Sequence, residues 1–433
     1  MNKYFEHLPS FLFSKNLKSI EVLVLAVVLF GGFCSNLQSV EFQPDETFWI
    51  GSSGRFDKFL TGDFESPIWN QPFVNYEVRP VPSYIVAMGQ RLGGIRTDDL
   101  PVYWDWALTK DQNISRGAMP SQTAIWWSRL PMAVISVFTL LGTIILIGKA
   151  HSRIAAYVFT FISLNDYFLL HLRRALSEAP LLLFTVLALY ASYKLLVAME
   201  QSSMKKIVSW SVIVGIFCGF AGQSKLTGLA CVAIPILGTF ILMFRSTPTS
   251  QKSGFRTLLM VGGLVLCSSL LIFIASYPFF YRNTLYRTLG TFYFRRAVIE
   301  GQEKLYASQV ILPNNRINIL FQRIFEYPVS LDSSSIADSL FHWINFLIAA
   351  FGAAYLMRLA WRRGQDWEKS VILLLGAVTC AVPMLFVPFD WDRYYLYPIF
   401  FSCIFFVIGI SQLFSIGYTE FQKQMHKKLA TRN

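Results

Sequence analysis

Residues 257–280 read TLLMVGGLVLCSSLLIFIASYPFF, a stretch of 24 residues without a charged side chain. A helix needs about 20 apolar residues to cross the roughly 30 Å hydrocarbon core of a bilayer. Similar runs recur along the chain, which is 54% hydrophobic and only 15% charged, whereas soluble proteins carry about 25% charged residues. The sequence therefore predicts an all-α polytopic membrane protein.

The apolar runs predict about ten transmembrane helices in one integral-membrane domain covering residues 1–433. We expect the spans at 20–37, 126–147, 154–171, 175–197, 207–223, 226–244, 257–280, 341–357, 370–388 and 395–416. The segments 38–125 and 281–340 are too long for simple connections. Both are rich in aromatic residues, which favour the membrane–water interface. We therefore expect short interfacial helices in each of these two loops.

The distribution of charge predicts the orientation of the spans. If the N-terminus is cytoplasmic, ten spans place the C-terminus there as well. That side then holds 19 of the 38 Lys and Arg residues but only 6 of the 26 Asp and Glu residues, as the positive-inside rule requires. The formal net charge of +12 thus follows from topology, and no nucleic-acid partner is predicted. Both long loops lie on the non-cytoplasmic face.

Three short turns on this outer face are basic, although the same rule predicts few Lys and Arg there. They contain Arg173 and Arg174, Lys225, and Arg393. Ionisable residues at the edge of a membrane domain are costly and are functional candidates, and such cations bind phosphate. Each could instead reach a lipid headgroup, or pair along its helix as Arg174 and Glu178 can. Three basic turns on one face favour a shared anionic ligand.

The first outer loop also contains two acidic motifs. Asp45-Glu46 directly follows the first span, where a carboxylate can bind a cation, pair with a base or act as an acid or base. Transfer of a sugar to a hydroxyl needs a carboxylate that takes the proton of the nucleophile. Further on, Glu77 and Arg79 stand just before Pro80-Val81-Pro82, whose fixed φ can hold Arg79 in one direction. An ordinary surface turn would have the same pattern.

Taken in order, these motifs resemble the GT-C superfamily of polytopic glycosyltransferases, which use polyprenyl-phosphate-linked sugars. The likeness is to protein O-mannosyltransferases and bacterial lipid A aminoarabinose transferases, although Arg79 stands where that pattern usually has His or Lys. The matching motifs are Asp45-Glu46, Glu77-Val78-Arg79-Pro80, Arg173-Arg174-Ala175-Leu176-Ser177-Glu178, Gly222-Gln223-Ser224-Lys225-Leu226-Thr227-Gly228 and Asp392-Arg393-Tyr394-Tyr395.

The resemblance implies inverting transfer of a sugar from a polyprenyl-phosphate donor to a lipid, glycan or protein acceptor. It implies Asp45 as the general base with Glu46 as its partner, and Glu77 as a residue that positions the acceptor or a divalent ion. A metal, if one is used, would bind Asp45 and Glu77. The cations implied to hold the donor phosphate are Arg79, Arg173, Arg174, Lys225 and Arg393, with Glu178 and Tyr394 in support. The implied location is a bacterial inner membrane.

Two other functions remain open at this point. A membrane transporter or lipid flippase would also be polytopic, but transporters often show internal repeats and polar residues deep within spans. This sequence shows no convincing repeat, and its charged residues cluster at one face. A non-catalytic member of the same fold is the second alternative, against which the intact Asp45-Glu46 pair argues.

Overall fold

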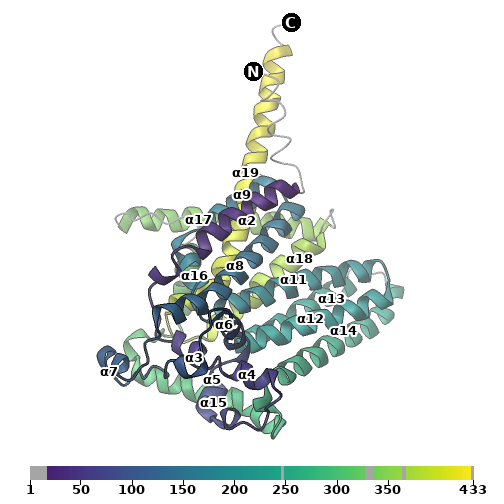
Figure 1. Ribbon diagram of the computed structural model, residues 1–433. Coiled ribbons are helices and arrows are strands. Elements are labelled where there is room, and N and C mark those ends of the chain that lie inside the picture. Colours follow the sequence, from purple (N-terminus) through teal and green to yellow (C-terminus); the bar gives the residue numbers. More distant parts are fainter. Residues whose placement is uncertain (1–16, 245–247, 327–334, 363–366, 431–433) are drawn as a thin grey trace.

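The long apolar runs form helices that pack side by side in the computed structural model of this protein (Figure 1). The structure describes residues 17–244, 248–326, 335–362 and 367–430. In these ranges the only β pairing is an isolated bridge between Val310 and Phe389. The longer helices are α2 (Ser19–Cys34), α6 (Pro80–Leu92), α8 (Gln122–Ala150), α9 (Arg153–Ile162), α11 (Glu178–Glu200), α12 (Met204–Ser224), α13 (Ala233–Phe244), α14 (Pro248–Ala275), α15 (Thr284–Leu305), α16 (Arg316–Glu326), α17 (Ser335–Arg362), α18 (Trp367–Ala381) and α19 (Leu396–Ala430).

Eight helical segments in the described part of the chain are long and apolar enough to cross a membrane. They coincide with eight of the ten predicted spans. The other two, predicted at 20–37 and 154–171, correspond to the shorter apolar helices Ser19–Cys34 and Arg153–Ile162. The predicted all-helical membrane fold is therefore confirmed, while the number ten stays a prediction.

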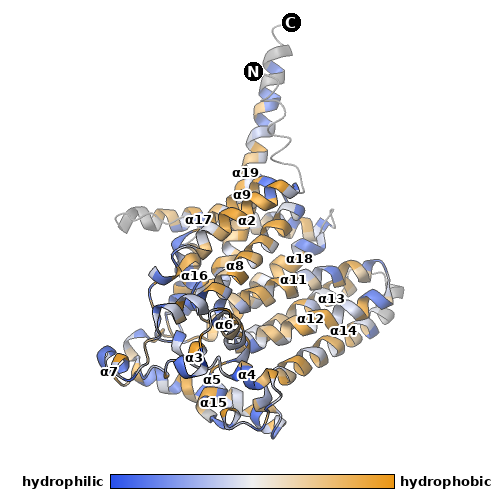
Figure 2. Cartoon of the chain, viewed as in Figure 1, coloured by the Kyte–Doolittle hydropathy of each residue, from blue (hydrophilic) through white to orange (hydrophobic). Residues whose placement is uncertain are grey.

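Most helices of the two long loops lie at the end of the molecule opposite the projecting C-terminal part of α19, whereas α16 is higher in the view (Figure 1). The first contains α3 (Glu46–Gly51), α4 (Arg55–Leu60), α5 (Pro72–Glu77) and α7 (Lys110–Ser115) in addition to α6. The second contains α15 and α16, and residues 327–334 of it lie outside the described residues. Figure 2 shows that this end is more hydrophilic than the helices above it. Helices are thus present in both loops, and their placement at the membrane interface stays a prediction.

Glycines let some of the spanning helices approach closely. A Cβ added to Gly352 of α17 would lie 1.9 Å from the backbone oxygen of Phe405 in α19. A Cβ on Gly409 of α19 would lie 2.1 Å from the oxygen of Ile348 in α17. Small residues at such crossings are typical of membrane helices, where close van der Waals packing drives association. The two glycines therefore set the distance between α17 and α19.

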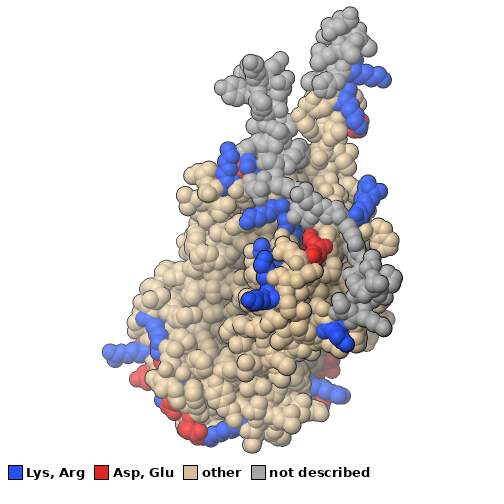
Figure 3. All heavy atoms as spheres, turned by 90° about the vertical axis from the view of Figure 1, so that its right-hand side faces the viewer, with Lys and Arg blue, Asp and Glu red and all other residues tan. Residues whose placement is uncertain are grey.

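The surface charges fit the predicted orientation. Figure 3 looks at the right-hand side of Figure 1 and shows Lys and Arg spread over its upper part with little Asp or Glu among them. Some residues used to predict the cytoplasmic side, namely Arg245, Arg363 and Arg432, lie outside the described residues. The orientation itself stays a prediction.

Candidate active site

Asp45 and Arg393 come from opposite ends of the sequence and form an ion pair. Asp45 precedes α3 directly, and Arg393 lies in a 3₁₀ turn, η8 (Asp392–Tyr395), directly before α19. The Arg393 Nη1 atom is 2.5 Å from the Asp45 Oδ2 atom, and the two side chains are 17% and 16% exposed. The sequence predicted a role for each residue. The structure places both at one point that solvent still reaches.

Lys225 and Glu178 form a second ion pair beside the first. Lys225 interrupts the helix after α12 with an extended backbone (φ −156°, ψ 139°). Its Nζ atom lies 3.1 Å from the Oε1 atom of Glu178, the first residue of α11, whose side chain is buried. Tyr394 joins the two pairs, because its ring centroid is 4.7 Å from the Lys225 ammonium and 5.6 Å from the Arg393 guanidinium. Such cation–π contacts stabilise cations at partly desolvated sites.

Glu77 reaches this cluster through an arginine that sequence reasoning missed. The Arg295 Nη1 atom of α15 lies 2.6 Å from the Glu77 Oε1 atom, and the same guanidinium lies beside the Tyr394 hydroxyl. Burial by itself would lower the pKa of Arg295, but the Glu77 carboxylate and Tyr394 raise it above its ordinary value. The neighbouring Arg296 is 83% exposed. We therefore add Arg295 to the candidate site, which unites Asp45, Glu77, Glu178, Lys225, Arg295, Arg393 and Tyr394.

The second outer loop holds the turn that carries Arg393. Arg323 of α16 contacts both carboxylate oxygens of Asp390, at 3.0 and 2.9 Å. This hydrogen-bonded pairing, although partly opposed by burial, raises the pKa of Arg323. The bridge between Val310 and Phe389 and a 2.7 Å hydrogen bond from the Ile311 amide to the Pro388 carbonyl add backbone contacts. The second outer loop therefore fixes η8 in place.

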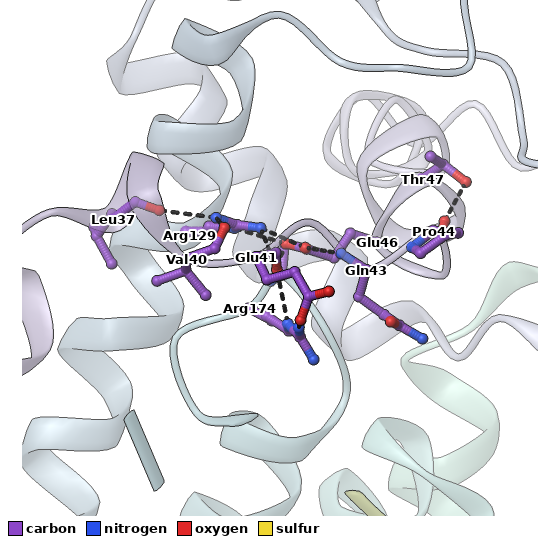
Figure 4. A network of polar contacts seen from close by, with 10 residues as sticks. Leu37, Val40, Glu41, Gln43, Pro44, Glu46, Thr47, Arg129 and Arg174 are labelled. Atoms are coloured by element: carbon purple, nitrogen blue, oxygen red, sulfur yellow. Dashed lines mark hydrogen bonds and ion pairs between the residues drawn. The ribbon is translucent and has the colours of Figure 1, made fainter. Parts of the chain in front are cut away.

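Glu46, the neighbour of Asp45, lies in a closed environment of its own (Figure 4). Its carboxylate accepts hydrogen bonds from Arg129 Nε at 2.9 Å and Arg129 Nη2 at 2.6 Å. It also accepts from the amides of Ala175 at 2.9 Å and Gln43 at 3.0 Å. The side chains of Glu46 and Arg129 are both 0% exposed. Glu46 thus joins the first loop to α8 and to the turn before α11.

Three predicted cations make contacts outside the cluster. The Arg174 Nη2 atom is 3.2 Å from a carboxylate oxygen of Glu41, and its Nε donates to the Glu41 carbonyl. Arg173 donates to the carbonyl of Ser35, near the end of α2. Arg79 precedes α6 directly, donates to the Tyr76 carbonyl and leaves its buried Nη1 atom without a hydrogen bond. Burial lowers the pKa of all three guanidinium groups. Glu77 partly opposes this effect on Arg79, and Glu46 and Glu41 partly oppose it on Arg174.

Comparisons with known proteins bear on the fold of this chain. The family model of dolichyl-phosphate-mannose-protein mannosyltransferases matches residues 106–281. The oligosaccharyltransferase of Archaeoglobus fulgidus in its apo form is 14% identical in sequence, with a TM-score of 0.51 over 93% of this chain and 51% of that chain. The chain has the GT-C fold. The predicted fold class is therefore confirmed.

Two further GT-C structures are similar to this chain, with lower TM-scores. ArnT from Cupriavidus metallidurans, bound to undecaprenyl phosphate, is 16% identical with a TM-score of 0.48, covering 90% of this chain and 59% of that chain. The Pmt1–Pmt2 protein O-mannosyltransferase complex of S. cerevisiae, bound to the sugar donor, is 19% identical with a TM-score of 0.43, covering 64% and 36%. The chain spans about half the length of the Archaeoglobus oligosaccharyltransferase. No curated protein sequence matches it.

A cavity of about 280 Å³ lies beside the polar cluster within the GT-C fold. Its lining includes Thr227 and Gly228, which follow Lys225 closely, and Tyr397 of α19. The hydroxyl of Tyr397 donates to the carbonyl of Glu178 at 3.4 Å. The remaining lining is mostly apolar and comes from α11, α18 and the turns beside them. The cluster of cations thus lies close to a mostly apolar cavity, an arrangement suited to a ligand with a charged head and an apolar body.

The carboxylates of the site do not fit a metal centre. Asp45 and Glu77, the two residues predicted as metal candidates, face Arg393 and Arg295 at 2.5 and 2.6 Å. Among the residues that the structure describes, no three His, Cys, Asp or Glu side chains form a group that could hold a metal ion. Hard divalent cations need several oxygen ligands. We therefore derive no step through a metal.

Proposed function

We propose that this protein transfers a sugar from a polyprenyl-phosphate donor to a hydroxyl acceptor on the non-cytoplasmic face of a bacterial inner membrane. The observation that carries the proposal is the Asp45–Arg393 ion pair, because it sets a carboxylate 2.5 Å from a phosphate-binding cation. Lys225 provides a second cation across the ring of Tyr394. The match of residues 106–281 to a family named for a dolichyl-phosphate-linked sugar supports this donor class.

The proposed reaction is a single displacement at the anomeric carbon of the sugar. An Asp45 carboxylate oxygen takes the proton of the acceptor hydroxyl while the hydroxyl oxygen forms a bond to the anomeric carbon. The bond from that carbon to the phosphate oxygen breaks, and its electron pair stays on the leaving lipid phosphate. Arg393 and Lys225 stabilise the charge that develops there. Attack opposite to the leaving group inverts the configuration of the sugar.

Arg393 has two proposed partners in this sequence of events. In the structure it neutralises Asp45. When a donor phosphate binds, the guanidinium turns its donors toward that phosphate, which frees the carboxylate to act as a base. Bidentate geometry makes Arg suitable for both partners. The rings of Trp391 and Tyr394, with centroids 5.7 and 5.6 Å from the guanidinium, keep it in place during the exchange.

The remaining predicted residues have supporting parts in the proposal. Glu77, held by Arg295, positions the acceptor, which is a lipid, glycan or protein. Glu178 holds the Lys225 ammonium at 3.1 Å. Arg174 is the third phosphate cation, once released from Glu41, whose side chain is 82% exposed. Contacts of Arg79 and Arg173 with the donor stay predictions. Both termini are proposed to be cytoplasmic.

The test is sugar transfer by the purified protein with a panel of radiolabelled polyprenyl-phosphate sugars. Loss of a general base typically costs about 10²–10⁴-fold in rate, so Asp45→Asn should lose nearly all transfer. Asp63→Asn is the matched control, because Asp63 is an acid of the same loop that pairs only with Lys58 among its described contacts, at 2.9 Å. Unchanged transfer by a folded Asp45→Asn variant would remove Asp45 as the base. A folded wild type that neither binds nor uses any donor would favour a transporter or a non-catalytic protein.

A further inference from the structure

A second cavity lies between α8, α11, α18 and α19, away from the active site. Its volume is about 480 Å³, and its lining is almost entirely apolar, with Ile147, Leu189, Ile372 and Phe400 among the side chains. Tyr193 of α11 also lines it. Tyr193 is 15 residues along the helix from Glu178 of the active site, or about 22 Å at 1.5 Å per residue. The part of the cavity beside Tyr193 therefore belongs to the half of α11 that we predict to face the cytoplasm.

Two lysines lie beside the tyrosine rings of this cavity. The Lys194 ammonium is 5.4 Å from the ring centroid of Tyr193 and 5.5 Å from that of Tyr190. The Lys369 ammonium is 5.5 Å from the Tyr193 centroid, and Lys369 itself lines the cavity near the start of α18. Tyr190, which is 38% exposed, lines the cavity as well. The cavity thus has an apolar interior and a rim of tyrosine rings and two ammonium groups.

This combination indicates the chemistry of an occupant. An apolar cavity within a membrane span is suited to an alkyl chain. Water is disfavoured there, since a dry apolar cavity offers it no hydrogen-bond partners. Two ammonium groups at the rim attract an anionic headgroup, and each basic residue near an anionic membrane surface contributes about a fivefold gain in affinity. Tyr at such a depth is typical of the membrane–water interface.

We propose that this cavity binds one anionic phospholipid of the cytoplasmic leaflet, with an acyl chain between α11 and α18 and its phosphate between Lys194 and Lys369. The site is separate from the proposed donor site, because its two lysines lie toward the end of α11 opposite Glu178 and near the start of α18. A lipid there connects α8, α11, α18 and α19. The proposal concerns the lipid surroundings of the protein and does not depend on the sugar-transfer reaction.

The experiment is native mass spectrometry of the full chain, purified in detergent, delipidated and titrated with a single lipid. Dioleoyl phosphatidylglycerol is compared with dioleoyl phosphatidylcholine, which has the same acyl chains and no net charge. The first bound phosphatidylglycerol should be preferred by about 25-fold, the product of about fivefold for each lysine. The double variant Lys194→Gln/Lys369→Gln should lose this preference while its binding of phosphatidylcholine is unchanged.

Two matched variants complete the design. Lys205→Gln/Lys206→Gln removes two exposed lysines near the start of α12, on the same predicted side, and should keep the preference. Leu373→Trp, which reduces the cavity that Leu373 lines, should weaken binding of both lipids. Equal binding of the two lipids by the wild type would overturn the proposal and leave only annular lipid. An equal effect of both lysine pairs would overturn it as well, because the attraction would then belong to the whole face.

Discussion

Replacing Glu46 by alanine would leave Arg129 charged in a place that solvent does not reach. The carboxylate of Glu46 accepts four hydrogen bonds, two from Arg129 and one each from the amides of Ala175 and Gln43. Both partners of the ion pair are 0% exposed. Arg129 would keep its hydrogen bonds to the carbonyls of Leu37 and Val40, both at 2.8 Å. Arg129 would therefore lose its counter-charge while it keeps part of its hydrogen bonds.

The magnitude follows from this environment. Removing one partner of a buried ion pair costs about 3–5 kcal/mol, because the other charge stays buried without compensation. The two amides that lose their acceptor act in the same direction. Asp63 provides the contrast, since its side chain and that of its partner Lys58 are 39% and 46% exposed. Exposed pairs contribute less than about 1 kcal/mol. We expect Glu46→Ala to lower the free energy of unfolding by about 3–5 kcal/mol and Asp63→Ala by less than about 1 kcal/mol.

The free energy of unfolding can be measured in mixed micelles by titration with sodium dodecyl sulfate, followed by tryptophan fluorescence. The double variant Glu46→Leu/Arg129→Met should recover part of the loss, because it removes both charges. It leaves the two amides and the carbonyls of Leu37 and Val40 without these side-chain partners. The reasoning is refuted if Glu46→Ala is no more destabilising than Asp63→Ala. It is also refuted if the double variant is less stable than Glu46→Ala, since that would show that Arg129 does not need a counter-charge.

Three further outcomes are expected. Arg393→Ala should weaken donor binding by about 10–100-fold in a direct binding titration, as loss of a charged hydrogen-bond donor does, and equal affinity would remove Arg393 from the phosphate site. Arg295→Ala should lower sugar transfer by about tenfold while the exposed neighbour Arg296→Ala leaves it unchanged; equal effects would contradict the inward role of Arg295. Gly352→Ala should lower stability by about 1–3 kcal/mol through a clash with a carbonyl of α19, whereas Gly262→Ala, which has open space around it, should not.

The sequence predicted most of the membrane architecture, because the physical requirement is simple. An apolar run of sufficient length must become a helix in a bilayer, so eight predicted spans match helices of that kind. It also predicted that Lys225 divides two neighbouring helices, and the backbone at Lys225 is extended. Ranges 20–37 and 154–171 fit less well, because α2 and α9 are short and periodicity does not determine where a helix ends.

The candidate site was only partly accessible to sequence reasoning. Asp45, Lys225 and Arg393 are unusual for their places along the chain, and that signal was enough to select them. Arg295 gave no such signal, because which of Arg295 and Arg296 faces inward depends on how α15 packs. Its neighbour Phe294 stacks on Tyr76 with ring centroids 5.2 Å apart, a tertiary contact that no local pattern shows. Arg129 did give a signal in the sequence, because it lies near the start of a long apolar helix, where a charge requires a partner.

Asp45 and Glu46 are a pair of neighbouring carboxylates in the sequence, but their surroundings in the structure differ. Glu46 has four donors and no exposed atom, so a change of partner during a reaction would cost it several hydrogen bonds at once. Asp45 is 16% exposed, and in the proposed reaction its partner Arg393 exchanges the carboxylate for the donor phosphate. Because the two residues are adjacent, the fixed position of Glu46 determines where the Asp45 backbone lies. In the proposed mechanism Glu46 therefore supplies the geometry and Asp45 supplies the chemistry.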